Sequence, residues 1–406
     1  MRLLSKLLRR FIHEGTLRIR DADGKVHVFG GRLPGPDVGI HLKDRKLYLQ
    51  LFLNPELSAA EAYMDGRLAL EGGATVYDFL LLFSVNRTRL YKYGPQGLLR
   101  RASRSLRRWR QANPNPIGLA AAHARHHYDI SGDLYRLFLD DDMQYSCAYF
   151  RDPEHDTLEQ AQRNKLIHAT SKLALRPGMT VAEIGSGWGG FAIHLARETG
   201  AHVTAINVSP EQIKAARAKA EAAGVSDRVE FRELDYRQFS GQFDRVVSVG
   251  MMEHVGIGHL DEYFMKIREL LKPDGYAFIH SIGRMSQPGT TGAFILKYIF
   301  PGGYVPSLSE TFAATERCGL WCDDMEVLRL HYRYTLKHWR ERFAQNRAKA
   351  AAIYDERFCR MWEFYLAVAE LEFLHGPYMV FQLLLSIKRD AVPIVRDFML
   401  DAERAS

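Results

Sequence analysis

The sequence predicts a doubly wound α/β domain that follows a smaller α+β domain. From residue 180 onward, strand-like and helix-like segments alternate in the order of a parallel sheet with helices on both faces. A glycine-rich stretch lies between the first of these strands and the helix after it. Residues 15–60 instead alternate apolar and polar residues as surface strands do. We therefore expect an N-terminal domain over 1–120 and a larger domain over 121–406.

The N-terminal domain is expected to begin with a helix over residues 1–14, whose apolar and basic residues fall on opposite sides. This helix could dock on the domain behind it or lie in a membrane interface, and the sequence favours neither. The Asp-Gly pair at 23–24 predicts a hairpin between strands. Further helices are expected over 58–85 and 97–110, and a linker at the NPNP sequence of 113–116.

The larger domain is predicted from segments that alternate between the two patterns. The expected strands are TVAEIG, HVTAINVS, RVEFREL, FDRVVSVG and YAFIHSIG. The expected helices are GFAIHLARETG, PEQIKAARAKAEAAG and HLDEYFMKIRELLKPDG. Beyond them come LRLHYRYTL, a long helical stretch over about 337–374, and a final strand at FQLLLSI.

Composition favours a folded protein of two or three domains in a reducing compartment. The chain has 406 residues, of which 47% are hydrophobic, enough to bury a sizeable core. Its four cysteines are too few for a disulfide framework and lack the paired spacing of a zinc site, so we expect no metal. The strongest apolar run, Phe79 to Val85, is far shorter than the roughly 20 residues that cross a bilayer. Basic residues interrupt the apolar N-terminus, which argues against a secretory signal.

Positive charge is concentrated in residues 79–128, which hold ten Lys or Arg residues and no Asp or Glu. Such a segment predicts an anionic partner, either nucleic acid or anionic lipid, although a solvated helical face would also explain it. The residues expected to contact a membrane are Arg100, Arg101, Arg104, Arg107 and Arg108. They could instead pair with carboxylates of the larger domain.

The most informative motif is EIGSGWGG, which begins at Glu183 and contains Gly185, Gly187 and Gly189. It follows an apolar strand and opens a helix, where glycines allow a tight turn and a close approach of the backbone to a ligand. The third glycine comes one residue too early for the nicotinamide dinucleotide pattern. A GxGxG sequence with an acidic residue two positions ahead is instead typical of class I methyltransferases, which use S-adenosyl-L-methionine (SAM). Their sheet is mostly parallel with an antiparallel last strand.

Polar residues follow the other expected strands, at the edge where ligands bind in open α/β sheets. The second strand ends at Asn207, with Gln212 one turn into the next helix, and the third ends at Asp235. Asn207 is neutral where most such folds have an acid, but it can still donate and accept hydrogen bonds. The fourth strand leads to Glu253, and the fifth contains His280.

Three further clusters hold groups that could take part in chemistry. They are HYD at 127–129 with MQYSCAYF at 143–150, FIHSIG at 278–283, and HYRYTL at 331–336. Each also has an ordinary explanation, because a lone cysteine, a strand-end histidine or an aromatic pair is often simple core packing.

Together these motifs resemble the cyclopropane-fatty-acid synthase family, which includes bacterial phospholipid enzymes and mycolic-acid cyclopropane synthases. The resemblance rests on YSCAYF, EIGSGWGG, MMEHVG, FIHSIG, IFPGG and HYRYTL, in this order, and extends over about 120–390. EAYMDG at 61–66 is similar to the extra N-terminal domain of the longer, phospholipid-acting members. Phe150 departs from the family, where many members have Trp, but the aromatic ring is kept.

The resemblance implies that the chain transfers the methyl carbon of SAM to the cis double bond of acyl chains in membrane phospholipids and closes a cyclopropane ring. An alkene is a poor nucleophile and needs a sulfonium as electrophile. The resulting cation then loses a proton to a base, which in the family is a bound bicarbonate ion. Aromatic rings such as those of Tyr332 and Tyr149 are expected to face the cation. The bicarbonate ligands implied by motif are Cys147, Glu253, His280 and Tyr332, with backbone donation at Ile282.

The resemblance also implies the SAM-binding residues, the partners and the location. The cofactor residues are Tyr145, Ser146, Gly185, Gly187, Gly189, Asn207, Gln212 and Asp235. The expected partner is a phospholipid bilayer with unsaturated acyl chains, and no nucleic acid. We expect a cytoplasmic protein, peripherally associated with the inner face of the membrane. The longer members are dimeric, so a homodimer is also expected.

Other functions stay open at this point. Relatives that methylate an olefin without closing a ring share most of these motifs. A small-molecule N- or O-methyltransferase could use the same fold, although it would not need the basic segment. A nucleic-acid methyltransferase could place that segment against phosphates, but no nucleic-acid module is recognisable. A lipid-binding protein with an inactive catalytic domain would not need the complete Cys, Glu, His and Tyr set.

Overall fold

The computed structural model describes residues 1–87 and 131–405, which form two compact units. The N-terminal unit comprises the described part of Met1–Arg107 with Thr291–Ile299 and Leu336–Pro377. The second, which we call the large-sheet unit, comprises the described part of Arg108–Thr290 with Phe300–Thr335 and Tyr378–Ser406. One helix, α14 (His331–Gln345), begins in the large-sheet unit and ends in the N-terminal unit.

The N-terminal unit is built on a four-stranded sheet. Its elements are α1 (Arg2–Phe11), β1 (Glu14–Arg20), β2 (Val26–Gly30), β3 (Leu33–Leu42), α2 (Leu47–Leu53), α3 (Pro55–Met64), β4 (Leu68–Glu71), α4 (Val76–Val85), a π-helical turn η3 (Ile295–Ile299), α15 (Arg347–Ile353) and α16 (Glu356–His375). The strand order is β2-β1-β3-β4, with β1 parallel to β3 and the other pairs antiparallel. α1 buries Leu4, Leu8 and Phe11 in the core of this unit, as a docked helix does.

Two predicted elements of this unit are wrong. The alternating pattern predicts strands throughout 15–60, whereas β3 ends at Leu42 and two helices follow. In the first of these helices Leu47 and Leu51, one turn apart, are both buried, so a helical face contacts the core. Residues 58–85 are not one helix, because Gly66 and Gly72 adopt positive φ and β4 lies between them. The helix predicted over 97–110 and the linker at 113–116 lie outside the described residues.

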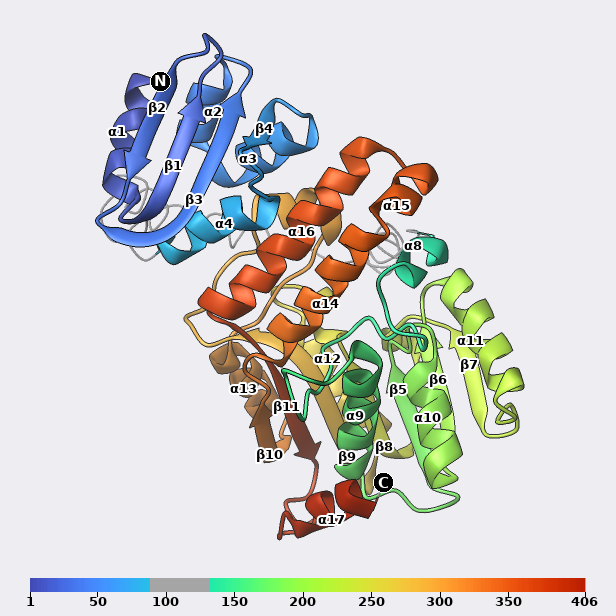
Figure 1. Cartoon of the computed structure of the whole chain (residues 1–406). Helices are drawn as coiled ribbons and strands as arrows, with labels where there is room; N and C mark the ends of the chain where they lie inside the picture. The colour runs from blue at the N-terminus through green and yellow to red at the C-terminus, as the bar shows by residue number, and fades with distance from the viewer. Residues whose placement is uncertain (88–130, 406) are drawn as a thin grey trace. The chain divides into compact units, whose positions relative to one another are not determined.

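The EAYMDG motif packs against segments from the later part of the sequence. Asp65 pairs with Arg357 of α16 at 2.8 Å, and Glu61 accepts hydrogen bonds from Lys297 at 2.6 Å and Tyr298 at 2.9 Å. Figure 1 shows α16 alongside α3 and α4. The sequence division near residue 120 assigns these later segments to the other domain, whereas in the structure they complete the N-terminal unit.

The large-sheet unit has the predicted doubly wound architecture. Its elements are α8 (Gly132–Arg136), α9 (Leu158–Ser171), β5 (Thr180–Ile184), α10 (Gly190–Thr199), β6 (His202–Asn207), α11 (Pro210–Ala222), β7 (Val229–Glu233), η1 (Tyr236–Gln238), β8 (Phe243–Val249), η2 (Met252–His254), α12 (Leu260–Leu270), β9 (Leu271–Arg284), α13 (Leu308–Arg317), β10 (Trp321–Val327), β11 (Tyr378–Ser386) and α17 (Asp397–Ala405). The strand order is β10-β11-β9-β8-β5-β6-β7. Only β11, the last strand in the sequence, runs antiparallel to its neighbours. The predicted fold class is therefore confirmed.

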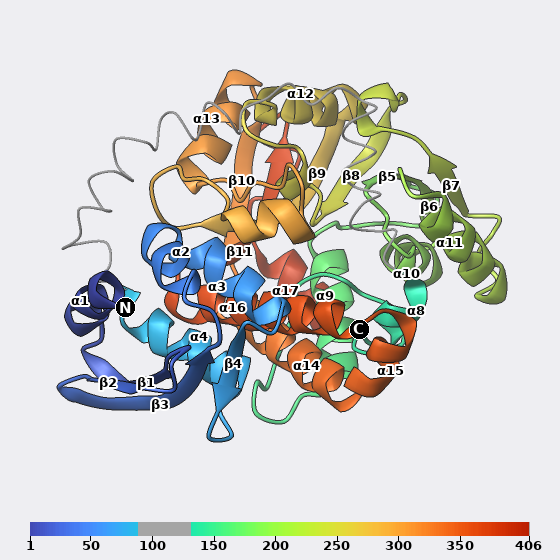
Figure 2. The same ribbon diagram turned by 90° about the horizontal axis from the view of Figure 1, so that it is seen from above.

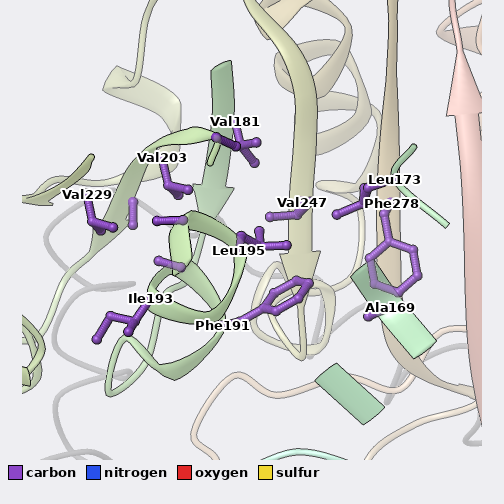
Figure 3. Packing of buried hydrophobic residues seen from close by; sticks show 14 of the residues in the cluster. Ala169, Leu173, Val181, Phe191, Ile193, Leu195, Val203, Val229, Val247 and Phe278 are labelled. Atoms are coloured by element: carbon purple, nitrogen blue, oxygen red, sulfur yellow. The ribbon is translucent and has the colours of Figure 1, made fainter. Parts of the chain in front are cut away.

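Helices cover both faces of this sheet. Seen from above, α12 and α13 lie on one face and α9 and α10 on the other (Figure 2). On the α10 face, Phe191 and Leu195 pack against Val247 and Phe278 (Figure 3). Because the central strands are buried on both faces, their sequences are apolar nearly throughout, which made them recognisable.

The end of the sheet differs from the expectation. β10 was not predicted, because this edge strand carries Asp323, Asp324 and Glu326 and lacks an apolar pattern. The segment LRLHYRYTL contains the first turn of α14, which begins at His331. The long helical stretch over 337–374 is divided among α14, α15 and α16.

The turn from β5 into α10 requires glycine at position 189 for packing. Gly189 has a φ of +83°, and a Cβ atom there would lie 2.6 Å from the Cβ of Ala216 in α11 and 2.8 Å from the ring of Phe231 in β7. This glycine therefore lets α10 approach its neighbours closely.

Replacing Gly189 with alanine should lower the free energy of unfolding by about 2–5 kcal/mol, because backbone strain of about 1–2 kcal/mol adds to overpacking of about 1–3 kcal/mol. Gly224→Ala is the matched control, since Gly224 has a φ of +67° but a Cβ there would have no atom within 4 Å. Urea denaturation measures both losses. Equal losses in the two variants would contradict the packing role.

Candidate active site

A cavity of about 150 Å³ lies at the carboxyl ends of β5, β6, β7 and β8. In doubly wound sheets this edge is where ligands bind. Seven of the eight predicted cofactor residues line it, and Gly189 does not. The seven are Tyr145, Ser146, Gly185, Gly187, Asn207, Gln212 and Asp235.

The glycine loop forms one wall of the cavity. The backbone N–H groups of Gly185 and Ser186 both donate to the carbonyl of Ile206 at 3.0 Å, which ties the loop to β6. Gly185 and Gly187 have φ values of +85° and +51°. A Cβ at Gly187 would meet no atom within 4 Å, so this position opens onto the cavity.

Polar side chains at the strand ends are held in place by one another. Asn207 Nδ2 donates to Gln212 Oε1 at 2.7 Å and to the carbonyl of Gly187 at 3.2 Å. Asp235 accepts from the backbone and the guanidinium of Arg237, at 3.0 and 2.8 Å. These groups can therefore be presented to a polar ligand with little loss of side-chain freedom.

Two buried ionisable groups also line the cavity. Lys165 of α9 donates to Ser146 Oγ at 3.2 Å and to Gln144 Oε1, and burial lowers its pKa to about 8. Burial raises the pKa of Glu183 to about 7, although Lys165 opposes the shift. Glu183 belongs to the glycine-loop motif, whereas Lys165 was not predicted from the sequence, because α9 buries polar residues and has no clear apolar face. The many polar residues of the α9 sequence were the signal that could have indicated a functional helix.

Glu253 lies in η2, just after β8. The backbone N–H of Ile282 donates to its Oε1 at 2.5 Å, and Oε2 is buried with no hydrogen-bond partner among the described residues. Burial raises the pKa of Glu253 to about 7, although the Ile282 bond opposes the shift. The predicted backbone donor at Ile282 is thus already bonded to Glu253.

His280 lies in β9 and lines the cavity. Burial lowers its pKa to about 3, and the positive charges of Lys165 and Lys172 add to the shift. Its Nδ1 lies 3.1 Å from Nε2 of Gln382 on the neighbouring strand β11. The ring is therefore neutral at physiological pH.

Two other predicted catalytic residues, Cys147 and Tyr332, are not among the residues that line the cavity. Cys147 is buried, its Sγ donates to the carbonyl of Ala148 at 3.3 Å, and burial raises its thiol pKa. Tyr332 is buried on the first turn of α14. Of the four predicted bicarbonate ligands, His280 lines the cavity. Glu253 is held close to the same strand, β9, because it accepts a hydrogen bond from the backbone N–H of Ile282.

Tyr149 does not have the predicted role. Its ring is stacked between His168 at 4.0 Å and His331 at 4.7 Å, with interplanar angles of 12° and 13°. Because both faces are covered, the ring cannot offer a face to a substrate cation. His331 also accepts a hydrogen bond from the backbone N–H of Phe150 at 3.0 Å, so this stack fixes the YSCAYF segment.

Several predicted features lie beyond what the structure describes. The arginines at 100–108 and the HYD cluster at 127–129 fall outside the described residues. Among the residues that are described, no helix is long and apolar enough to span a bilayer.

The residues present fit a nucleoside ligand that also carries charged groups. Gly187 leaves room beside the loop, Asn207 and Gln212 can donate and accept, and Tyr236 adds an aromatic wall. Beyond them, a neutral imidazole and a carboxyl group with a raised pKa could bind an anion or hold a proton.

Comparison with known proteins agrees with this geometry. The family model for mycolic acid cyclopropane synthetase matches residues 119–383. A probable fatty acid methyltransferase from Pseudomonas putida is 36% identical, over 91% of this chain and 91% of its own. A cyclopropane-fatty-acyl-phospholipid synthase from Escherichia coli K12 is 40% identical, over 60% of this chain and 62% of its own. Mycolic acid cyclopropane synthase CmaA1, solved with SAH and CTAB, has a TM-score of 0.62 and 29% identity, covering 65% of this chain and 97% of its own.

Replacing Gly187 with valine should weaken SAM binding about 5- to 150-fold, because a side chain would enter the cavity at a cost of about 1–3 kcal/mol. Gly178→Val is the matched control: its φ of +82° imposes similar strain, but it does not line the cavity. Calorimetric titration with SAM measures both. Normal SAM binding by Gly187→Val would show that this loop is not the cofactor site.

Proposed function

The chain belongs to the mycolic acid cyclopropane synthetase family of SAM-dependent methyltransferases, and we propose that it adds the SAM methyl carbon to the cis double bond of acyl chains in membrane phospholipids, closing a cyclopropane ring. One observation carries the proposal. A SAM-type glycine-loop cavity has His280 in its wall, and Glu253 is joined to the same strand through the Ile282 N–H. Methylation of an alkene leaves a cation that must lose a proton from carbon, and these two residues are placed to serve that step.

The cofactor, when bound, supplies a methyl group on a sulfonium, which is an electrophile strong enough for an alkene. Gly185, Gly187, Asn207, Gln212 and Asp235 would hold it, because they line the cavity and are already oriented. Among these groups only Asp235 has an ionisable side chain, and Arg237 is paired with it at 2.8 Å. These five residues can therefore bind and orient the cofactor without supplying a base.

The proton released as the ring closes must go to a group that is basic but does not attack the cation. Glu253 fits this requirement, because burial brings its pKa to about 7 and the Ile282 N–H holds one oxygen. Bicarbonate, the base that the family resemblance implies, would accept the proton and pass it on. Its first proposed ligands are His280 in the cavity wall and Glu253, whose Oε2 is buried with no hydrogen-bond partner among the described residues. Cys147 and Tyr332 stay proposed ligands of this ion.

A second outcome is favoured by the fatty acid methyltransferases among the relatives. One relative that matches along nearly the whole chain, from Pseudomonas putida, is described as a probable fatty acid methyltransferase. The same first step without ring closure would leave a methyl branch. Which product forms depends on whether the cation loses its proton faster from the new methyl group, which closes the ring, or from a neighbouring carbon of the acyl chain.

Lipids from cells that express the chain should gain the mass of one CH2 group on monounsaturated phospholipid chains. Proton NMR of the purified lipids then distinguishes a cyclopropane, with its strongly shielded ring protons, from a methyl branch. The Gly187→Val variant is the control and should produce neither. Unchanged acyl chains in cells that contain soluble, SAM-binding protein would contradict the proposal.

Glu253→Gln should lower kcat about 10²- to 10⁴-fold, the range of general acid–base catalysis, and keep SAM affinity within several-fold. Gln keeps the acceptor for the Ile282 N–H, so folding should be preserved. Glu262→Gln, at an exposed position on α12, is the control and should be fully active. Removing bicarbonate from the wild-type assay should reproduce the loss. An enzyme that is indifferent to rigorous bicarbonate depletion would exclude bicarbonate as the base, and a fully active Glu253→Gln variant would exclude Glu253.

Membrane association forms a further part of the proposal, because the double bond of a phospholipid lies inside the bilayer. The support is in the sequence: residues 79–128 hold ten basic residues and no acids. A Lys or Arg near an anionic membrane contributes about 1 kcal/mol, and the gain falls off within a Debye length. A few of the five arginines between 100 and 108 would therefore suffice for reversible binding at the inner face of the membrane.

Vesicle co-sedimentation tests this association. Binding should rise with anionic lipid, weaken with salt, and drop sharply when the five arginines become Gln, while activity on detergent-dispersed lipid is retained. The five are Arg100, Arg101, Arg104, Arg107 and Arg108. A charge-matched control changes five exposed basic residues of the large-sheet unit, Arg176, Arg197, Lys214, Arg232 and Lys388. Equal vesicle binding by both variants and the wild type would leave the arginines without a membrane role.

A further inference from the structure

A chain of polar side chains, which the steps above do not use, ends at His280 in the cavity wall. It begins on α17 and passes through α9, β10 and β11 to β9. Lys172, Gln382 and His280 are buried, as is His168. In order, the members are Glu403, His168, Glu326, Lys172, Gln382 and His280.

In the first part of this series of side chains, from Glu403 to Lys172, acidic and basic groups alternate. His168 lies 3.0 Å from Glu403 Oε2 through Nδ1 and 2.8 Å from Glu326 Oε2 through Nε2. Burial alone would lower the pKa of His168, but the two carboxylates outweigh it and raise the pKa. Burial would raise the pKa of Glu326, but the bonds to His168 and Lys172 bring it down to about 2. Glu326 is therefore an anion that accepts from Lys172.

Lys172 determines which way the amide of Gln382 faces. An ammonium group has donors and no acceptor, so the atom of Gln382 that faces Lys172 must be the oxygen. Lys172 Nζ donates to Gln382 Oε1 at 2.5 Å. The amide nitrogen is then directed to the other side, where Nε2 lies 3.1 Å from Nδ1 of His280. Gln382 and His280 are direct cross-strand partners in β11 and β9, which keeps this distance short.

The direction of the last bond fixes the proton on the histidine. An amide nitrogen donates and cannot accept, so Nδ1 of His280 must be the acceptor. A neutral imidazole carries one proton, which then has to be on Nε2. We propose that Gln382, oriented by Lys172, is a positioning residue that holds His280 as the Nε2–H tautomer and so presents an N–H donor to the cavity.

The consequence for catalysis rests on the proposed function. A histidine whose Nδ1 is occupied and whose Nε2 is protonated can donate to an anion but cannot take a proton from the substrate. His280 would thus bind and orient bicarbonate, and the proton would pass to that ion or to Glu253. The structure therefore distinguishes the roles of the two residues: His280 is a donor and Glu253 an acceptor.

Nitrogen-15 NMR of histidine-labelled protein reads this tautomer without substrate. The His280 signals are assigned by their loss in His280→Asn. The wild type should show a protonated Nε2 and an unprotonated Nδ1. In Gln382→Glu, a carboxylate of the same shape accepts from both Lys172 and His280, so the proton should move to Nδ1. Gln160→Glu, at an exposed position on α9, adds the same charge and should change nothing.

The kinetic part uses the same variants. Gln382→Glu should lower kcat about 10- to 100-fold, as loss of an outer-shell partner does, with unchanged SAM affinity. A wild-type His280 protonated on Nδ1, or a Gln382→Glu variant that keeps the Nε2–H tautomer, would overturn the assignment. A flipped tautomer with full kcat would overturn its catalytic importance. If the NMR spectra show the predicted tautomers but the enzyme leaves alkenes unchanged, the positioning role of Gln382 is supported and only the proposed function is rejected.

Discussion

The large-sheet unit depends on one physical constraint, which is the cost of burying ionisable groups at the carboxyl edge of its sheet. A buried charge is tolerated when it is paired, and otherwise the group becomes neutral. Lys165 and Lys172 are bonded to acceptors, whereas Glu183 and Glu253 have pKa values raised to about 7. His280 is neutral for the same reason. The site therefore holds groups that can exchange protons near neutral pH.

The fold satisfies this constraint through neighbouring strands. β8 leads to Glu253, β9 carries His280 and Ile282, and β11 supplies Gln382 from the opposite direction. The antiparallel pairing of β11 with β9 places Gln382 directly across from His280. The apolar cores on both faces fix the strand register and so the positions of all these groups.

The sequence predicted what local pattern controls and missed what depends on distant partners. The apolar strands and the glycine loop predicted the doubly wound sheet, and the family resemblance implied the seven cofactor residues that line the cavity. It missed β10, because an edge strand rich in acids has no apolar periodicity. Lys165 and Gln382 were missed because nothing near them in sequence marks their partners. Tyr149 was misinterpreted, since a motif does not reveal that two histidines cover its ring.

The central claim is that burial keeps Glu253 protonated until near neutral pH, and infrared spectroscopy tests it most directly. Because its pKa is raised from 4.5 to about 7, the neutral carboxyl is favoured by folding, and that stabilisation is lost as the pH rises through about 7. The difference spectrum between wild type and Glu253→Gln should contain a protonated carboxyl band at one pH unit below 7 that disappears one unit above it. A carboxylate that is already ionised near pH 5, as an ordinary glutamate with a pKa of 4.5 would be, would contradict the account.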